Sequence, residues 1–125
     1  MEMNIETRSS EGVVRRLRLT GRLVQSELAQ QSEAVEQSLA VAGSPQPVLL
    51  DLSDADFIDS SGLSWLLVWH KRHRAAGGRL ILHSLPSLVM DVVKMMRLDL
   101  VLDLAEDEEA ALAMAREGEK HEELE

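Results

Sequence analysis

The hydrophobic positions of this chain form strand-like and helix-like stretches that follow one another along the sequence. Val13 to Leu23 alternates apolar with basic or polar side chains, which is typical of a strand with one buried face. Val48 to Leu52 is apolar with almost no alternation, as in a strand that is buried on both faces. From Leu63 onwards the apolar residues recur at helical spacing, and Gly77-Gly78 ends that pattern.

The complete pattern predicts the element order β-β-α-β-α-β-α-β-α. The predicted strands are residues 3–7, 13–23, 48–52, 80–82 and 100–104, and the predicted helices are 26–42, 60–76, 86 to about 96, and 105–116. A short acidic loop, Ser53 to Asp56, is expected between the central strand and its helix. Strands separated by helices need crossover connections, so the sequence predicts an α/β domain with a mixed central sheet and helices packed on it.

Charge is concentrated at the end of the chain. The net charge is −9, and residues 106–125 hold nine acidic against two basic side chains, which leaves about −2 for the rest. With 125 residues, one domain is expected. We therefore expect that domain over residues 1–117, followed by an acidic, disordered tail over 118–125.

Composition excludes several classes of protein. Cysteine is absent, so no disulfide and no thiolate site can form. No apolar run reaches the roughly 18 to 20 residues of a membrane span, and the polar N-terminus has no signal-peptide pattern. No basic face dominates, which argues against nucleic acid as a direct partner. We expect a soluble, cytoplasmic protein without membrane insertion.

The candidate chemistry lies at Asp59-Ser60-Ser61-Gly62, where a predicted helix begins directly after a strand and loop. The N-terminus of a helix has unpaired N–H groups and the positive end of its dipole, so an anion such as a phosphate is stabilised there. A serine hydroxyl in this place is a candidate for regulated phosphorylation. The alternative is that Asp59 and Ser60 only cap the helix, and capping preferences alone favour that alternative.

Other kinds of site have weaker support. His70 lies ten residues beyond Ser60, which is about 15 Å along a helix, so it cannot act as a base for that serine. His83 could approach only through the fold, and no G-x-S-x-G motif is present. His70 and His73 alone do not make a metal site. The sequence predicts no catalytic residue, no metal and no cofactor.

Several stretches resemble one known family. F-I-D-S-S-G-L (Phe57 to Leu63) resembles the signature of STAS domains, the family of bacterial anti-sigma factor antagonists. Three further stretches resemble the family's turn before its first helix, its glycine-bounded strand, and its late helix with an edge strand: L-T-G-R-L (19–23), A-A-G-G-R-L-I-L (75–82) and residues 89–104. The resemblance covers most of the chain.

This resemblance implies a non-enzymatic, protein-binding role. The hydroxyl after the motif aspartate, Ser60, would be the phosphoacceptor of an anti-sigma factor that is also a serine kinase. The unphosphorylated protein would bind that partner and release a sigma factor for transcription. In one departure, Val24 stands where family members in kinase switches usually have an acidic residue. Two alternatives stay open: an accessory STAS subunit of a lipid-transport ABC complex, and, with less support, a serine hydrolase.

The expected partner surface contains the motif residues and two tryptophans, namely Asp59, Ser60, Ser61, Gly62, Trp65 and Trp69. The tryptophans are four residues apart and share a helix face. Either both indoles belong to the core, or at least one is exposed and forms the apolar centre of the partner surface. A homodimer is a further state that the sequence allows.

Overall fold

The computed structural model describes residues 4–11, 14–24, 47–75 and 77–123. These residues form the following elements in chain order: β1 (Asn4–Glu11), β2 (Val14–Leu23), β3 (Val48–Ile58), α2 (Ser60–Ala75), β4 (Leu80–His83), α3 (Ser87–Met95), the 3₁₀ helix η2 (Leu98–Leu100), β5 (Asp103–Ala105) and α4 (Glu108–Glu123). The predicted first helix, residues 26–42, lies outside the described residues.

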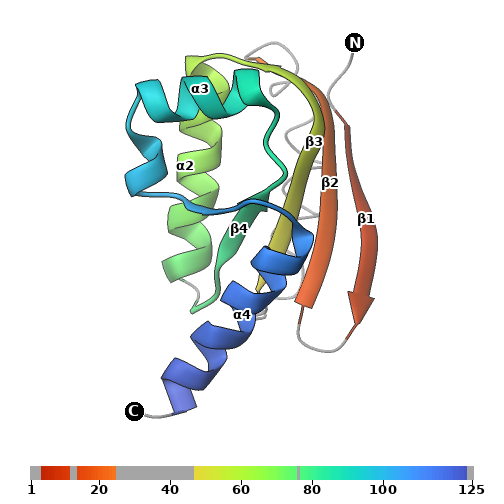
Figure 1. Cartoon of the computed structure of the whole chain (residues 1–125), viewed down its shortest axis with the longest axis vertical. Coiled ribbons are helices and arrows are strands. Elements are labelled where there is room, and N and C mark those ends of the chain that lie inside the picture. The colour runs from red at the N-terminus through yellow and green to blue at the C-terminus, as the bar shows by residue number, and fades with distance from the viewer. Residues whose placement is uncertain (1–3, 12–13, 25–46, 76, 124–125) are drawn as a thin grey trace.

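One five-stranded sheet carries the domain, with its strands in the order β1-β2-β3-β4-β5. β1 and β2 are antiparallel, whereas the other neighbouring pairs are parallel. The parallel pairs β3/β4 and β4/β5 require crossovers, which α2 and α3 with η2 provide (Figure 1). The predicted α/β class and mixed sheet are therefore confirmed.

The central strands are buried on both faces. Leu50 and Leu52 of β3 lie in a core formed with α2 and α3, whereas their neighbour Leu49 packs with Ala111 and Ala115 of α4. Successive side chains of a strand point to opposite faces, so a strand between two helical layers must be apolar at nearly every position. This explains the absence of alternation in the sequence of β3.

The predicted acidic loop, Ser53 to Asp56, is wrong, because these residues continue β3 to Ile58. Thr20 pairs with Asp54 and Gly21 with Ala55, so the long partner strand β2 extends β3 beyond the point where its composition suggests an end. Asp54 and Asp56 are exposed while Ala55 is buried. Strand pairing and burial thus override the low strand preference of Ser and Asp.

The end of the chain also differs from the prediction. The edge strand begins at Asp103 instead of residue 100, because Leu98–Leu100 forms η2. The last helix was expected to end near Arg116, but α4 continues to Glu123, so the segment expected to be a disordered tail is helical through most of its length. Its first turn is acidic, and the Asp107 side chain caps it by accepting a hydrogen bond from the Ala110 N–H at 2.8 Å.

The first turn of α2 lies directly against the ends of β2 and β3. Gly62 is buried, and a Cβ atom there would collide with the backbone oxygen of Leu23 and lie 2.7 Å from Cγ1 of Ile58. The backbone of a paired strand cannot move aside cheaply, so the close approach requires glycine. This contact fixes where α2 begins and therefore where Ser60 lies.

We expect Gly62→Ala to lower the free energy of unfolding by about 1 to 3 kcal/mol, because the added methyl group overpacks a rigid contact. Urea denaturation followed by circular dichroism measures the change. The matched control is Ser64→Ala on the exposed side of the same helix, which should change the stability by less than about 0.5 kcal/mol. Equal free energies of unfolding for the two variants would show that the close contact of Gly62 does not contribute to stability.

A group of buried polar side chains lies toward the last turns of α2. His70 is 5% exposed, and its Nδ1 has no hydrogen-bond partner among the residues that the structure describes. Burial lowers the pKa of His70 below its ordinary value of 6.5; nearby Asp103 raises it, while Arg74, Arg79 and His73 lower it. Because the folded pKa lies below the unfolded one, the unfolded chain binds the proton more readily.

We therefore expect the contribution of His70 to stability to be complete above about pH 6.5 and to be lost progressively as the pH falls below that value. Denaturation at a series of pH values measures the slope, which for one group cannot exceed about 1.4 kcal/mol per pH unit. His70→Gln should flatten the curve between about pH 6.5 and 5. Parallel curves for the two proteins would contradict the assignment.

Candidate functional site

The candidate site is the junction of β2, β3 and the N-terminus of α2. Asp59 is the N-cap of α2, since its Oδ1 accepts a hydrogen bond from the N–H of Gly62 at 3.0 Å. Its own backbone N–H donates to the oxygen of Leu23 at 3.3 Å, and its carbonyl oxygen accepts from Leu63 at 3.0 Å. The motif aspartate is therefore fully used in joining the helix to the strand ends.

The two serines of the motif differ in accessibility. Ser60, the first residue of α2, is exposed, whereas Ser61 is half-buried. The capping alternative is confirmed for Asp59, whereas no hydrogen bond assigns Ser60 a part in the cap. Among the described residues, the Ser60 side chain takes part in no hydrogen bond or ion pair. Its hydroxyl is thus open to a modifying enzyme, and Ser61 is the less accessible rival.

Electrostatics around Ser60 combine opposing contributions. The first N–H groups of α2 and its dipole favour an anion at this place. Two carboxylates oppose it: Asp56 is exposed on β3, and Asp59 is half-buried at the cap. The carboxylate of Asp54, farther back on β3, lies 3.5 Å from Nη1 of Arg18. A cation, Arg22, stands at the end of β2 and lies over the Phe57 ring with 5.4 Å between its Cζ and the ring centroid.

The tryptophans do not form an exposed patch. Trp69 is 4% exposed and belongs to the main core, and Trp65 is half-buried and packs against that core. Their rings meet edge to face with centroids 6.5 Å apart, and the Arg72 guanidinium lies 4.9 Å from the Trp69 centroid. Neither indole is exposed as the partner-surface alternative required, because Trp69 lies on the same buried stripe of α2 as Leu66 and His73.

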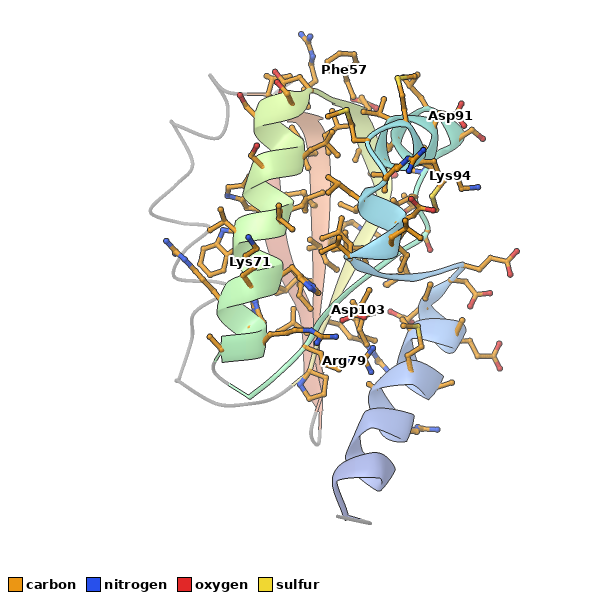
Figure 2. All side chains as sticks on the ribbon, turned by 90° about the vertical axis from the view of Figure 1, so that its left-hand side faces the viewer. Phe57, Lys71, Arg79, Asp91, Lys94 and Asp103 are labelled. Atoms are coloured by element: carbon orange, nitrogen blue, oxygen red, sulfur yellow. The ribbon has the colours of Figure 1, made fainter. Side chains whose placement is uncertain are left out.

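The exposed aromatic residue beside Ser60 is Phe57. It is 39% exposed, and Figure 2 shows it at the end of the molecule where α2 begins. In the sequence, Phe57 stands out only as part of the F-I-D-S-S-G-L motif. Its position, three residues before Ser60 at the end of a strand, was a signal that could have placed it on this surface.

A second polar group lies within the sheet, away from Ser60. Asp51 is buried, accepts a hydrogen bond from the Ser53 N–H at 2.9 Å, and lies 3.6 Å from Nε of Arg18. Burial raises the pKa of Asp51, but the hydrogen bonds from Ser53 and the charges of His83 and Arg18 outweigh it, so the pKa is lowered overall. This group fixes the central strands.

His83 belongs to that second group and not to the candidate site. Asp51 pairs with His83 in β4 and with Arg18 in β2, five residues before Leu23. Five strand residues span about 16 Å, so the imidazole is far from Ser60. Its Nδ1 instead lies 2.9 Å from Oγ of Ser84. This geometry removes the candidate base of a Ser60 hydrolase.

Metal ligation and membrane insertion find no support in the part of the chain that the structure describes. There, no three His, Cys, Asp or Glu side chains are grouped so as to hold a metal ion. His73 instead donates its Nδ1–H to the oxygen of Trp69 at 2.8 Å. None of the described helices is both long and apolar enough to cross a membrane.

Comparison with solved structures finds many similar folds, and three of the proteins that match this chain in length are described as anti-sigma factor antagonists. An anti-sigma factor antagonist from Mycobacterium paratuberculosis has 17% identity and a TM-score of 0.76, with 92% of this chain and 95% of that chain covered. A STAS domain protein from Planctomyces limnophilus, also described as an anti-sigma factor antagonist, has 25% identity, a TM-score of 0.71 and coverage of 91% and 98%. The unphosphorylated antagonist SpoIIAA has 23% identity, a TM-score of 0.67 and coverage of 91% and 96%.

Comparison at the level of sequence gives two results. No curated protein matches this chain. A family model described as "Mlab, STAS domain" matches residues 6–106, which include β2, β3, α2 and the complete D-S-S-G motif. Since that match spans most of the sequence and the folds agree, this chain belongs to the STAS domain family.

Proposed function

We propose that this protein is an anti-sigma factor antagonist of the cytoplasm, whose binding to an anti-sigma factor with serine kinase activity is ended by phosphorylation of Ser60. The observation that carries the proposal is the exposed Ser60 hydroxyl at the start of α2, beside a cap that Asp59 alone supplies. The similar structures of antagonists, SpoIIAA in its unphosphorylated form among them, support the same role.

The modification is a transfer of one phosphoryl group. The Ser60 oxygen forms a bond to the γ-phosphorus of ATP, the bond from that phosphorus to the bridging oxygen of ADP breaks, and the hydroxyl proton passes to a base of the kinase. The product carries about −1.5 to −2 charges at neutral pH. The helix dipole stabilises it by about 0.3 to 1 kcal/mol, so α2 survives the modification.

The modification changes the surface more than the fold. An added phosphate near the exposed carboxylate of Asp56 and the cap carboxylate of Asp59 makes this end of the molecule more negative. A partner that docks here must desolvate the phosphate, which is costly unless it supplies matching cations. Binding is therefore expected to weaken, and the sigma factor is recaptured by its anti-sigma factor.

A second candidate function is an accessory subunit of a lipid-transport ABC complex. Val24 is half-buried and takes the place of the usual acidic residue near the acceptor, which favours a STAS domain that is not phosphorylated. The family model, too, is described by the name Mlab and not as an antagonist. In this role the same surface would bind a transporter ATPase without a covalent switch.

We expect Ser60→Asp to weaken binding to the cognate anti-sigma factor at least tenfold, which is about 1.4 kcal/mol, while Ser60→Ala retains binding and resists phosphorylation. Calorimetric titration measures the affinity, and mass spectrometry after incubation with the kinase and ATP locates the phosphate. Ser61→Ala is the matched control and should still be phosphorylated.

Two results would contradict this proposal. Phosphate on a residue other than Ser60 would remove the assigned acceptor. Purification from the native host with a transporter ATPase, together with unchanged affinity of Ser60→Asp for it, would establish the second candidate function instead.

A further inference from the structure

Arg22 occupies an irregular place in the ladder between β2 and β3. Gly21 pairs with Ala55, but Arg22 pairs with Phe57, so Asp56 is passed over and the register shifts by one residue. Gly21 has a φ of 92°, a left-handed conformation that glycine adopts without strain. Such irregularities redirect the side chain that follows them. The local backbone therefore places Arg22 beside Phe57 at the end of the sheet.

The guanidinium of Arg22 is held by a ring and not by a carboxylate. Its Cζ lies 5.4 Å from the Phe57 centroid, while both residues are exposed. By contrast, Arg16 and Arg18 of the same strand face Glu108 and Asp51, respectively. Among the described residues Arg22 has no ion pair. A planar cation stacked on a ring keeps its N–H edges available for an anion.

The start of α2 is joined to the strand end that carries Arg22 by a short chain of contacts. The residue after Arg22 is Leu23, whose oxygen accepts the hydrogen bond from the Asp59 N–H at 3.3 Å. Gly62 packs against the same Leu23 oxygen. Asp59 and Gly62 bracket the serines, so the start of α2 is fixed against the strand end that carries Arg22. Ser60 is exposed at this junction.

We propose that Arg22, braced by Phe57, is the counter-ion of phosphorylated Ser60. The inference rests on Ser60 as the acceptor in the proposed function and names the residue through which its modification acts. A charge-assisted pair between guanidinium and phosphate is among the stronger polar contacts in proteins. It offsets the repulsion that Asp56 and Asp59 exert on the phosphate.

This pairing gives the switch a second effect. In the unmodified protein the exposed Arg22 is available to a carboxylate of the partner protein. In the phosphorylated protein the guanidinium is occupied by the phosphate on the same chain. Phosphorylation of Ser60 therefore adds negative charge to the docking surface and also makes the Arg22 guanidinium unavailable to the partner. Together the two effects explain how a single phosphate at the edge of the surface could end binding.

The experiment places phosphoserine at position 60 during protein synthesis and follows its second ionisation by ³¹P nuclear magnetic resonance. We expect the phosphate pKa in the otherwise unchanged protein to be lower by about 0.5 unit or more than in the Arg22→Gln variant, because a cation stabilises the dianion. That shift is about a threefold change in proton affinity. The dipole of α2 acts equally in both proteins and cancels.

Arg72→Gln is the matched control, because it removes the same charge from an arginine that also stacks on an aromatic ring, farther along α2. Its phosphate pKa should equal that of the protein with both arginines. Equal values for Arg22→Gln and Arg72→Gln would overturn the proposal.

A second measurement needs no variant of Arg22. Replacing Ser60 by phosphoserine should move the Nε–H signal of Arg22 and leave that of Arg72 in place, and an unmoved Arg22 signal would also overturn the proposal. Neither measurement uses a kinase or a partner. If both measurements show no pairing of Arg22 with the phosphate, the proposed function is unaffected. If no kinase phosphorylates Ser60, the pKa and Nε–H measurements on the synthetic phosphoserine are still valid.

Discussion

The contact between the first turn of α2 and the end of β2 is the constraint on which the candidate site depends. Gly62 allows the helix to approach the Leu23 oxygen, and the Asp59 N–H donates to that same oxygen. A side chain at position 62 would push α2 away and break this bond. Since the helix start is fixed to two neighbouring strands, the backbone of Ser60 has one defined position. Site geometry here is a consequence of backbone packing.

The two ends of the α2 dipole favour charges of opposite sign. Its last turn contains Arg72, His73 and Arg74, which complement the negative end of the helix dipole. Its first turn contains no acidic residue, so the positive end is met only by the Asp59 cap. An anion added at Ser60 would complete the pattern of charges along the helix. This asymmetry lets a phosphate be tolerated by the fold while it changes the surface.

How far the sequence predicts the structure depends on which interactions decide each element. Periodicity identified α2, β4 and the double burial of β3, because those signals come from the side chains of the elements themselves. The extension of β3 through Asp54 and Asp56 was missed, because it results from pairing with β2 and not from local preference. The burial of Trp69 depends on neighbours from other parts of the chain, which a helical pattern alone does not reveal.

The same distinction between local signals and contacts applies to the residues of the candidate site. The motif identified Asp59, Ser60 and Gly62, but their separate tasks appear only when the contacts are known. The cap belongs to Asp59 and the close packing to Gly62, so neither residue can change without cost to the fold. Ser60 carries neither task and is exposed. Because stability is supplied by its neighbours, the proposed phosphorylation at position 60 would leave the helix that presents the hydroxyl in place.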